Sequence, residues 1–470
     1  MTLHLYDTAS KTIKPLVAPP DKPLRMYTCG PTVYNFAHIG NWRTFLFSDV
    51  LRRTLHYFGV DVLQVMNLTD VDDKTIRGAL EHKMPLKAYT DQYIAAFLED
   101  LQTLNMQVPE QMPRATEFMP FMIELIAGLM DRGAAYAKEG NVFFRIAAFK
   151  DYGKLSHICL EHNETGASNR VTADEYEKEH ASDFVLWKAY DAARDGDIYW
   201  EAPWGKGRPG WHTECSAMAM EILGETIELH VGGVDLVFPH HENEIAQSET
   251  MTNKPFALHW AHAEHLMVEG KKMSKSAGNF YTLRDLLDKG YTGPQIRFLL
   301  IQSHYRTSHN FTLEGLQAAQ NSLDRLSDFI YRLRHLPDIE TTAAITLLTE
   351  AHNAFDKAIG EDLNTSQALG VLFDFVRNIN TLIDDEALGA SEGAQVLSLL
   401  QTFDRILGVL PLEENAQTMD PALLEALQKR NAARKAKDWE TADAMRDWIA
   451  QAGYVIEDTP QGARLKPCKK

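Results

Sequence analysis

Cysteine is scarce in this chain of 470 residues, which contains four: Cys29, Cys159, Cys215 and Cys468. That number is too small for a disulfide framework and fits a reducing cytoplasm. Long apolar runs are also missing, since no stretch approaches the ~20 residues that span a bilayer. The N-terminal segment MTLHLYDTASKTIK has no apolar run of the kind found in secretory signals. We therefore expect a cytoplasmic protein with no membrane partner.

Positive charge is in deficit as well. The sequence has 47 Lys or Arg against 65 Asp or Glu, a net charge of −18, which excludes a basic chromatin-type protein. A field of that sign repels nucleic acid, so any such partner must be held by local basic patches. The segment from Lys429 to the C-terminus is one, with ten basic residues against six acidic ones. Its densest part is the run KRNAARKAKDW.

A strand–helix–strand unit is the first recognisable element of structure. Residues 24–28 predict a strand, and a glycine-containing loop, CGPTVYNFAHIGN, follows. A helix then repeats apolar residues on one face, and the apolar strand VDVLQVMNLTD comes after Gly59. This pattern is typical of a parallel βαβ unit, whose ligand site lies beyond the carboxyl ends of the strands.

The remaining chain predicts three further regions. Residues from about 116 to 200 combine a helix, the short alternating stretch NVFFRI and a polar segment, which we interpret as an insertion in the first domain. The sheet pattern resumes near Ile227. From about 313 to 410 alternating apolar and charged faces at helical spacing indicate a helical bundle, and the last ~55 residues form a separate piece.

Two short motifs carry the chemistry of phosphate binding. His38-Ile39-Gly40-Asn41 lies where the first loop turns into a helix, and helix N-termini bind anions through unpaired N–H groups. Gly40 allows a ligand to approach the backbone, while His38 and Asn41 add donors. By itself the motif also fits an ordinary polar loop.

The second motif is KMSKS, in which two lysines and two serines are packed into one loop. Such a loop can neutralise a triphosphate and follow its charge into the transition state. Its members are Lys272, Ser274, Lys275 and Ser276.

A third set of residues has the chemistry of a metal site. Cys29 ends the first strand, Cys215 lies in GWHTECSAM, and His240 and Glu244 lie in PHHENE. Pro239 suits the first turn of a helix, on which an i, i+4 spacing would place His240 and Glu244 on one face. Two thiolates, an imidazole and a carboxylate suit tetrahedral Zn²⁺. The spacing also fits a buried histidine packed beside two buried cysteines.

Seven segments together resemble the cysteinyl-tRNA synthetases, which are class I aminoacyl-tRNA synthetases. They run in order over nearly the whole chain: CGPTVYNFAHIGN, NLTDVDDK, PRAT, DFVLWK, GRPGWHTECSAM, GGVDLVFPHHENEIAQS and KKMSKSAGNF. The resemblance implies an α/β fold: a Rossmann-like parallel-sheet catalytic domain with an insertion, then a helical bundle and a small C-terminal domain. Expected boundaries are 1–312 (insertion about 116–200, connection containing KMSKS about 266–312), 313–415 and 416–470.

The resemblance also implies a reaction. ATP, with Mg²⁺, and cysteine give cysteinyl-adenylate, and the cysteinyl group passes to the 3′ end of tRNA(Cys). His38, Asn41, Lys272 and Lys275 would act in catalysis, and Gly40, Ser274 and Ser276 with Lys275 in ATP binding. Asn41 replaces the second histidine of the family's HIGH motif, and an amide cannot become cationic. We therefore expect Lys275 to carry more of the charge.

Zinc explains how such an enzyme rejects serine. The family's ligands fall on Cys29, Cys215, His240 and Glu244, with one Zn²⁺ per chain. A pocket contact alone discriminates by only ~10–200-fold, whereas Zn²⁺ strongly favours a thiolate over a hydroxyl. Trp211 and His230 flank these residues and are expected to shape the substrate pocket.

Two other hypotheses fit parts of the sequence. A cysteine–aminosugar ligase of the mycothiol pathway type shares the zinc and adenylate chemistry, but it lacks the C-terminal region that reads tRNA. A non-catalytic tRNA-binding paralogue should have lost KMSKS or a zinc ligand, and this chain keeps both. We expect an enzyme that binds tRNA(Cys) and is a monomer.

Overall fold

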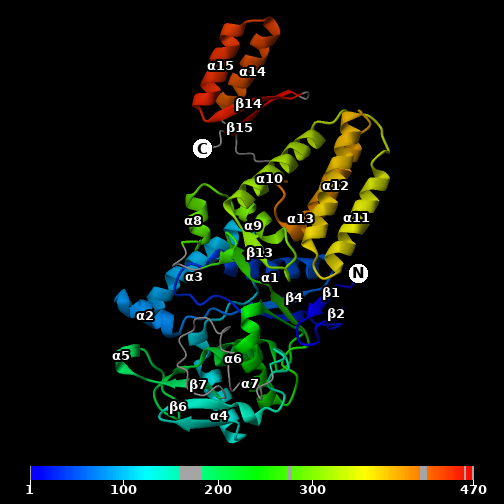
Figure 1. The fold of residues 1–470 in the computed structure, drawn as a ribbon. Helices are drawn as coiled ribbons and strands as arrows, with labels where there is room; N and C mark the ends of the chain where they lie inside the picture. Colours follow the sequence, from blue (N-terminus) through cyan, green and yellow to red (C-terminus); the bar gives the residue numbers. More distant parts are fainter. Residues whose placement is uncertain (1, 159–182, 274–277, 413–420, 460–461, 468–470) are drawn as a thin grey trace. The chain divides into compact units, whose positions relative to one another are not determined.

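A parallel four-stranded sheet in the order β10-β9-β3-β4 forms the centre of the N-terminal region, and its strands come from segments drawn in blue and green in Figure 1. Its strands are β3 (Leu24–Thr28), β4 (Val62–Met66), β9 (Leu229–Gly233) and β10 (Trp260–Ala263). All three neighbouring pairs are parallel. The structure is a computed structural model that describes residues 2–158, 183–273, 278–412, 421–459 and 462–467.

Helix α1 (Ile39–Tyr57) connects β3 to β4 and confirms the predicted βαβ unit. The helix forms because its apolar residues recur at helical spacing, and Phe47, Val50, Leu51 and Leu55 are all buried. Phe58, an apolar residue one position after the end of α1, is the C-cap. Gly59 follows with a φ of +79°, a conformation that ends the helix and favours glycine.

The order of the strands places a switch point between β3 and β9. The chain moves outward from β3 to β4 in one direction and from β9 to β10 in the other. Ligand sites of open α/β sheets lie at the carboxyl ends of the strands at such a point. The backbone N–H of Cys29, just beyond β3, donates to the carbonyl of Val231 in β9 at 3.2 Å.

An antiparallel sheet in the order β5-β6-β7-β8 lies between β4 and β9 in the sequence. The predicted stretch NVFFRI contains β6, whereas the sequence did not reveal the three other strands. The polar part of the expected insertion falls largely on 159–182, outside the described residues, as does Cys159. The elements from β4 to β9 are α2 (Asp73–Glu81), α3 (Leu86–Thr103), α4 (Met119–Asp131), β5 (Ala135–Lys138), β6 (Asn141–Arg145), β7 (Asp183–Ala189), α5 (Ala192–Asp195), β8 (Gly207–Pro209) and α6 (Trp211–Leu223).

The remaining elements before residue 313 are mostly shorter. A two-stranded antiparallel sheet of β1 and β2 precedes β3, and β12-β11-β13 forms a three-stranded sheet. Their bounds are β1 (His4–Asp7), β2 (Thr12–Pro15), a π-helical turn (Val237–His241), α7 (Glu242–Thr252), β11 (Leu266–Val268), β12 (Lys271–Lys272), α8 (Leu283–Asp288), α9 (Gly293–Ile301) and β13 (His309–Phe311).

Long helices follow, as the sequence predicts: α10 (Leu313–Arg334), α11 (Ile345–Gly360), α12 (Thr365–Asp384) and α13 (Ala390–Leu407). The chain divides into two compact units. One consists of Met1–Gln317, Ala354–Gly370 and Arg405–Gly408, and the other of Ala318–Asn353, Val371–Asp404 and Val409–Lys470. Within the described ranges, no helix is both long enough and apolar enough to cross a membrane.

The C-terminal piece has a small core of its own. Its elements are α14 (Pro421–Ala436), α15 (Trp439–Gln451), β14 (Tyr454–Thr459) and β15 (Gly462–Pro467). Leu423, Ala426, Ile449 and Leu465 pack together in this core. Arg430 is 8% exposed and pairs with Asp458 through both guanidinium nitrogens, at 2.5 and 2.7 Å. Part of the basic run is therefore neutralised within the fold.

We predict that Gly30→Ala destabilises the protein, because the added methyl group would clash with the backbone at the carboxyl edge of the central sheet. A Cβ at Gly30 would lie 1.8 Å from the carbonyl oxygen of Asn67, which belongs to the backbone and cannot rotate away. We expect a loss of about 3 kcal/mol or more, measured as a lower midpoint of thermal unfolding. In the control Gly370→Ala, a helical Cβ meets nothing within 4 Å, so stability should be unchanged or higher. Equal melting of the two variants would contradict the prediction.

Candidate metal centre and nucleotide site

Cys29 reaches the site from the carboxyl end of β3. The adjacent N–H of Gly30 donates to Oδ1 of Asn67 at 2.8 Å, which fixes the turn after the strand. The Cys29 side chain is buried, with 6% of the residue exposed. Its sulfur lies 4.0 Å from the sulfur of Cys215, which α6 supplies and which is 1% exposed. Two cysteines 186 residues apart in sequence thus share one buried position.

His240 and Glu244 come from the turn before α7 and from its first turn. Nε2 of His240 lies 3.0 Å from Oε1 of Glu244, so the predicted i, i+4 pair forms. Phe238 is extended (φ −139°, ψ 130°), as expected for the residue before a proline. The helical turn that contains Pro239 then runs directly into α7, which begins at Glu242.

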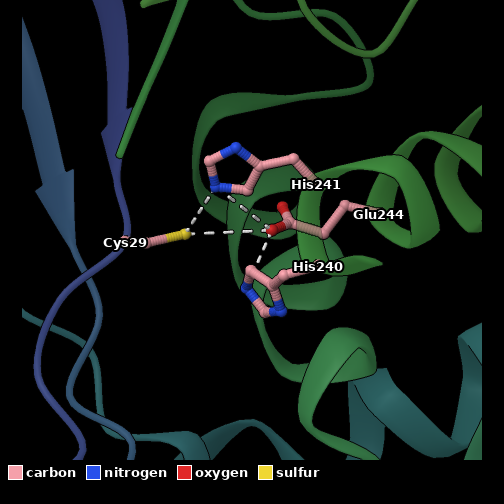
Figure 2. Close-up of side chains that lie close together, drawn as sticks. All are labelled: Cys29, His240, His241 and Glu244. Atoms are coloured by element: carbon pink, nitrogen blue, oxygen red, sulfur yellow. Dashed lines mark hydrogen bonds and ion pairs between the residues drawn. The ribbon is translucent and has the colours of Figure 1, made fainter. Parts of the chain in front are cut away.

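His241 joins this cluster, although it was not among the predicted metal ligands. Figure 2 shows Cys29, His240, His241 and Glu244 pointing toward a common centre. Four ligand atoms, one from each residue, lie within 4.8 Å of one another, and all four residues are buried. Nε2 of His241 is 3.3 Å from the Cys29 sulfur and 4.0 Å from Oε1 of Glu244. The doubled histidine in PHHENE was the available signal, but spacing alone cannot rank adjacent histidines.

The donor atoms fit a tetrahedral zinc ion. Zn–S bonds of about 2.3 Å place two sulfurs of a tetrahedron about 3.8 Å apart, close to the 4.0 Å between Cys29 and Cys215. Nε2 of His240 is buried and faces Oε1 of Glu244 at 3.0 Å, so both atoms point to the same centre. Its other nitrogen, Nδ1, lies 2.9 Å from Nδ1 of His212. This contact fixes the orientation of the His240 ring, and such outer contacts orient metal-binding histidines.

A second layer of side chains orients these donors. Nε2 of His230 lies 2.9 Å from Oε2 of Glu244, leaving Oε1 to face the centre. The Trp211 ring stacks on His240, with centroids 4.0 Å apart. The structure therefore places both predicted pocket residues directly beside metal-type donors. His241 is held through Nδ1, which lies 2.7 Å from Nε2 of His262.

Electrostatics in this buried centre limit how much negative charge it holds. Burial raises the pKa of a carboxyl group, but His230 and His240 lower the pKa of Glu244 to about 2, so it is ionised. Burial and then Cys215 raise the pKa of Cys29 well above its usual value. Against the effect of burial, the hydrogen bond from Cys29 lowers the pKa of Cys215. Without a cation, the pair of Cys29 and Cys215 therefore carries one thiolate. A bound divalent cation would stabilise both cysteines as thiolates.

The His38 motif begins α1 as predicted. Nδ1 of His38 accepts a hydrogen bond from the N–H of Asn41 at 3.2 Å. Oδ1 of Asn41 accepts from the N–H of His38 at 3.3 Å, so the two residues form a capping box. The Asn41 side-chain oxygen is thereby occupied, and its NH₂ group remains the donor that it offers to a ligand.

The segment around KMSKS lies against this helix start. The N–H of Ile39 donates to the carbonyl of Tyr281 at 3.0 Å, and His38 pairs with Thr282 in an antiparallel bridge. A Cβ at Gly40 would lie 3.3 Å from Cε of Met273, the second residue of the KMSKS motif. Two motifs that are far apart in sequence thus meet. Ser274, Lys275 and Ser276 are outside the described residues, and of Lys272 the structure describes the backbone, in β12.

Comparison with known proteins agrees with this architecture. The family model described as "tRNA synthetases class I (C) catalytic domain" matches residues 16–321. A DALR domain matches 354–411, and a cysteinyl-tRNA ligase anticodon-binding domain matches 417–464. The fold and the paired motifs thus define a class I aminoacyl-tRNA synthetase.

Curated relatives narrow this class. A protein of Protochlamydia amoebophila named cysteine–tRNA ligase is 54% identical over 466 residues, covering 99% of this chain and 98% of its own. One of Chlamydia pneumoniae with the same name is 50% identical over 470 residues, with the same coverage. The chain belongs to the cysteine–tRNA ligase family.

Solved structures of much lower sequence identity share the same fold. Methionyl-tRNA synthetase of Mycobacterium tuberculosis gives a TM-score of 0.59 at 16% identity, covering 83% of this chain and 88% of its own. A protein of Campylobacter jejuni described as a putative arginyl-tRNA synthetase gives 0.54 at 12% identity, covering 83% and 92%. At such low identity these likenesses concern the fold alone, which is the predicted α/β fold with a parallel sheet.

We predict that the imidazole of His38 is neutral at physiological pH. Burial lowers its pKa to about 4, although Asp235 acts in the opposite direction. An unfolded histidine titrates near 6.5, so the stability contributed by the neutral ring is lost as pH falls through this window. NMR titration of the ring should give a midpoint near 4, with His38→Asn identifying the signal. A midpoint near 6.5 would contradict the prediction.

Proposed function

We propose that the chain activates cysteine with ATP and transfers the cysteinyl group to the 3′ end of tRNA(Cys). The observation that carries this proposal is the buried cluster of Cys29, His240, His241 and Glu244, with Cys215 beside Cys29, at the carboxyl edge of the sheet from which the His38 motif also starts. Relatives named cysteine–tRNA ligase, which match this chain over nearly its whole length, support the proposal. The matched anticodon-binding domain favours tRNA over an aminosugar as the acceptor.

We infer that Cys29, Cys215, His240 and Glu244 hold one Zn²⁺ per chain. When bound, this ion supplies a Lewis acid that prefers the thiolate of cysteine to the hydroxyl of serine. His241 would then support the ligand Cys29 and would not bind the zinc itself, because its Nε2 is within hydrogen-bond distance of the Cys29 sulfur. Trp211 fixes the His240 ring, and His230 orients the Glu244 carboxylate.

The two phosphate-binding motifs perform the first step. The carboxylate of cysteine attacks the α-phosphate of ATP, and pyrophosphate leaves. This reaction needs positioning and charge stabilisation rather than a protein nucleophile. His38 and Asn41 supply neutral donors, and Gly40 allows close approach. Lys272 and Lys275 supply positive charge, Ser274 and Ser276 supply hydroxyl donors, and Mg²⁺ accompanies the triphosphate.

The two C-terminal regions bind the tRNA. We assign residues 1–312 to catalysis, with the insertion at about 116–200 and the KMSKS connection at about 266–312. Residues 313–415 form the helical tRNA-binding bundle, and 416–470 form the anticodon domain. Because two thiols must stay reduced, we place the enzyme in the cytoplasm. We propose that it acts as a monomer.

The test of this function is ATP–pyrophosphate exchange with purified protein. Cysteine should support exchange, and serine should be rejected by more than the ~200-fold that a simple pocket allows. The same preparation should charge tRNA(Cys) and contain about one zinc per chain by metal analysis. Exchange supported by an aminosugar acceptor without tRNA charging would favour the mycothiol-type ligase instead.

Two variants separate the metal ligands from their supports. Cys215→Ser should lose zinc and cysteine-dependent exchange together. His241→Gln should keep zinc, with affinity reduced by about 10- to 100-fold, the usual cost of losing a supporting contact. Active enzyme without zinc would refute the zinc proposal. Zinc retained in Cys215→Ser but lost in His241→Gln would exchange these two residues in the ligand set.

We further predict that Trp439 contributes to tRNA charging. It is 60% exposed at the start of α15, and the exposed residues Lys435 and Lys437 precede it. Base stacking on an aromatic ring is worth ~1–3 kcal/mol by alanine substitution. Trp439→Ala should therefore raise the KM for tRNA by about 5- to 100-fold and leave cysteine-dependent exchange unchanged.

Trp448 provides the matched control. It is 41% exposed on the same helix, and nine residues place it about half a turn away from Trp439. Trp448→Ala should charge tRNA normally.

Deletion of residues from about 420 onward should likewise leave cysteine-dependent exchange intact while weakening tRNA charging severely, and the remaining affinity for tRNA should depend less on salt. If Trp439→Ala charges tRNA normally, Trp439 is not part of the tRNA interface. If the deletion variant is folded and charges tRNA normally, the whole C-terminal region is not part of that interface.

A further inference from the structure

The loop between β3 and α1 exposes two aromatic side chains. Tyr34 is 37% exposed and Phe36 is 39% exposed. Both lie within four residues of His38, in the segment that leads into the first phosphate-binding motif. Nothing in adenylate formation, as derived above, uses either ring.

Helix α3 holds both residues in place. The hydroxyl of Tyr89 donates to the carbonyl oxygen of Tyr34 at 2.8 Å. The ring of Phe36 meets that of Tyr93 edge to face, with centroids 5.5 Å apart. Tyr89 and Tyr93 in turn pack on each other at 5.2 Å. Helix α3 therefore supports the Phe36 ring directly and fixes the backbone that carries Tyr34.

Each exposed ring is accompanied by a cation. Nζ of Lys74 lies 5.4 Å from the centre of the Tyr34 ring, and Cζ of Arg284 lies 5.0 Å from that of Phe36. Arg284 also pairs with Glu99 at 2.8 Å and with Asp100 at 3.2 Å. Its charge is thus matched within the protein, and what it offers a ligand is mainly a flat guanidinium surface.

These residues lie where the two phosphate-binding segments meet. The antiparallel bridge joins His38 to Thr282. Phe36 lies in the loop two residues before His38, and Arg284 lies in α8 two residues after Thr282, where it contacts the Phe36 ring. Because a residue spans at most ~3.6 Å, Phe36 lies within about 7 Å of His38 along the chain and Tyr34 within about 14 Å.

Aromatic rings beside planar cations are the surfaces on which proteins stack the bases of single-stranded nucleic acid. The transfer step must bring the unpaired 3′ end of tRNA to the adenylate, which forms beside His38. We propose that Tyr34 and Phe36 form an aromatic platform that stacks unpaired bases of this 3′ end and positions it for transfer. The proposal rests on the proposed function and adds a tRNA-positioning site to it.

Substitution of Phe36 tests the platform. Phe36→Leu keeps an apolar contact for Tyr93 but removes the stacking surface, and Phe36→Tyr retains it. In single-turnover reactions with preformed cysteinyl-adenylate, Phe36→Leu should slow transfer to tRNA(Cys) by about 5- to 100-fold, the range for one lost base stack. Phe36→Tyr should restore the rate. The loss should be similar at low and high salt, because the Arg284 charge is already paired.

Tyr34→Leu, with Tyr34→Phe as its control, repeats the test at the second ring. A tRNA(Cys) transcript shortened by its unpaired 3′ nucleotides should bind all four variants and the unaltered protein equally, because it cannot reach the platform. Unchanged transfer in both leucine variants would overturn the proposal. So would an equal loss of affinity for the shortened transcript, which indicates a general structural defect, or a raised KM for ATP, which assigns the rings to ATP. Absence of cysteine-dependent exchange in the unaltered protein would refute the proposed function instead.

Discussion

The parallel pairing of β3 with β9 is the contact on which the rest of the site depends. These strands are adjacent in the sheet although about 200 residues separate them in sequence. Their pairing brings Cys29, at the end of β3, within reach of Cys215 and of the turn that follows β9. The connection from β3 to α1 carries the first phosphate-binding motif to the same edge. One set of backbone hydrogen bonds therefore places metal-type donors and phosphate-binding groups side by side.

Charge is the second constraint on this edge. The centre buries a carboxylate and two thiols, and burying unpaired charge is costly. The surrounding histidines offset part of this cost: His230 and His240 keep Glu244 ionised, while the two thiols share a single negative charge. Zinc, as proposed, would supply the missing positive charge. The donor set is in this sense incomplete without a cation, which suits a site that must also attract a substrate thiolate.

Recognition of a polyanion by an acidic chain poses a related problem. The net charge of −18 opposes tRNA binding at long range. Several cations that could attract tRNA are already paired within the fold, including Arg430 with Asp458 and Arg284 with Glu99. Exposed aromatic rings, Trp439 in the C-terminal piece and Tyr34 and Phe36 beside His38, offer contacts that do not depend on net charge. We infer that stacking supplements a limited number of phosphate contacts.

The sequence by itself determined the local elements and the pairs set by spacing. Strand Leu24–Thr28, the helix after it and the His240–Glu244 pair follow from periodicity, which adjacent residues impose on one another. Only the tertiary structure decided which adjacent histidine faces which donor, because His240 and His241 are equivalent in spacing. It also decided that Arg430 is neutralised by Asp458 and that β7 and β8 complete a sheet with β5 and β6. These outcomes depend on contacts between distant segments, which no local pattern records.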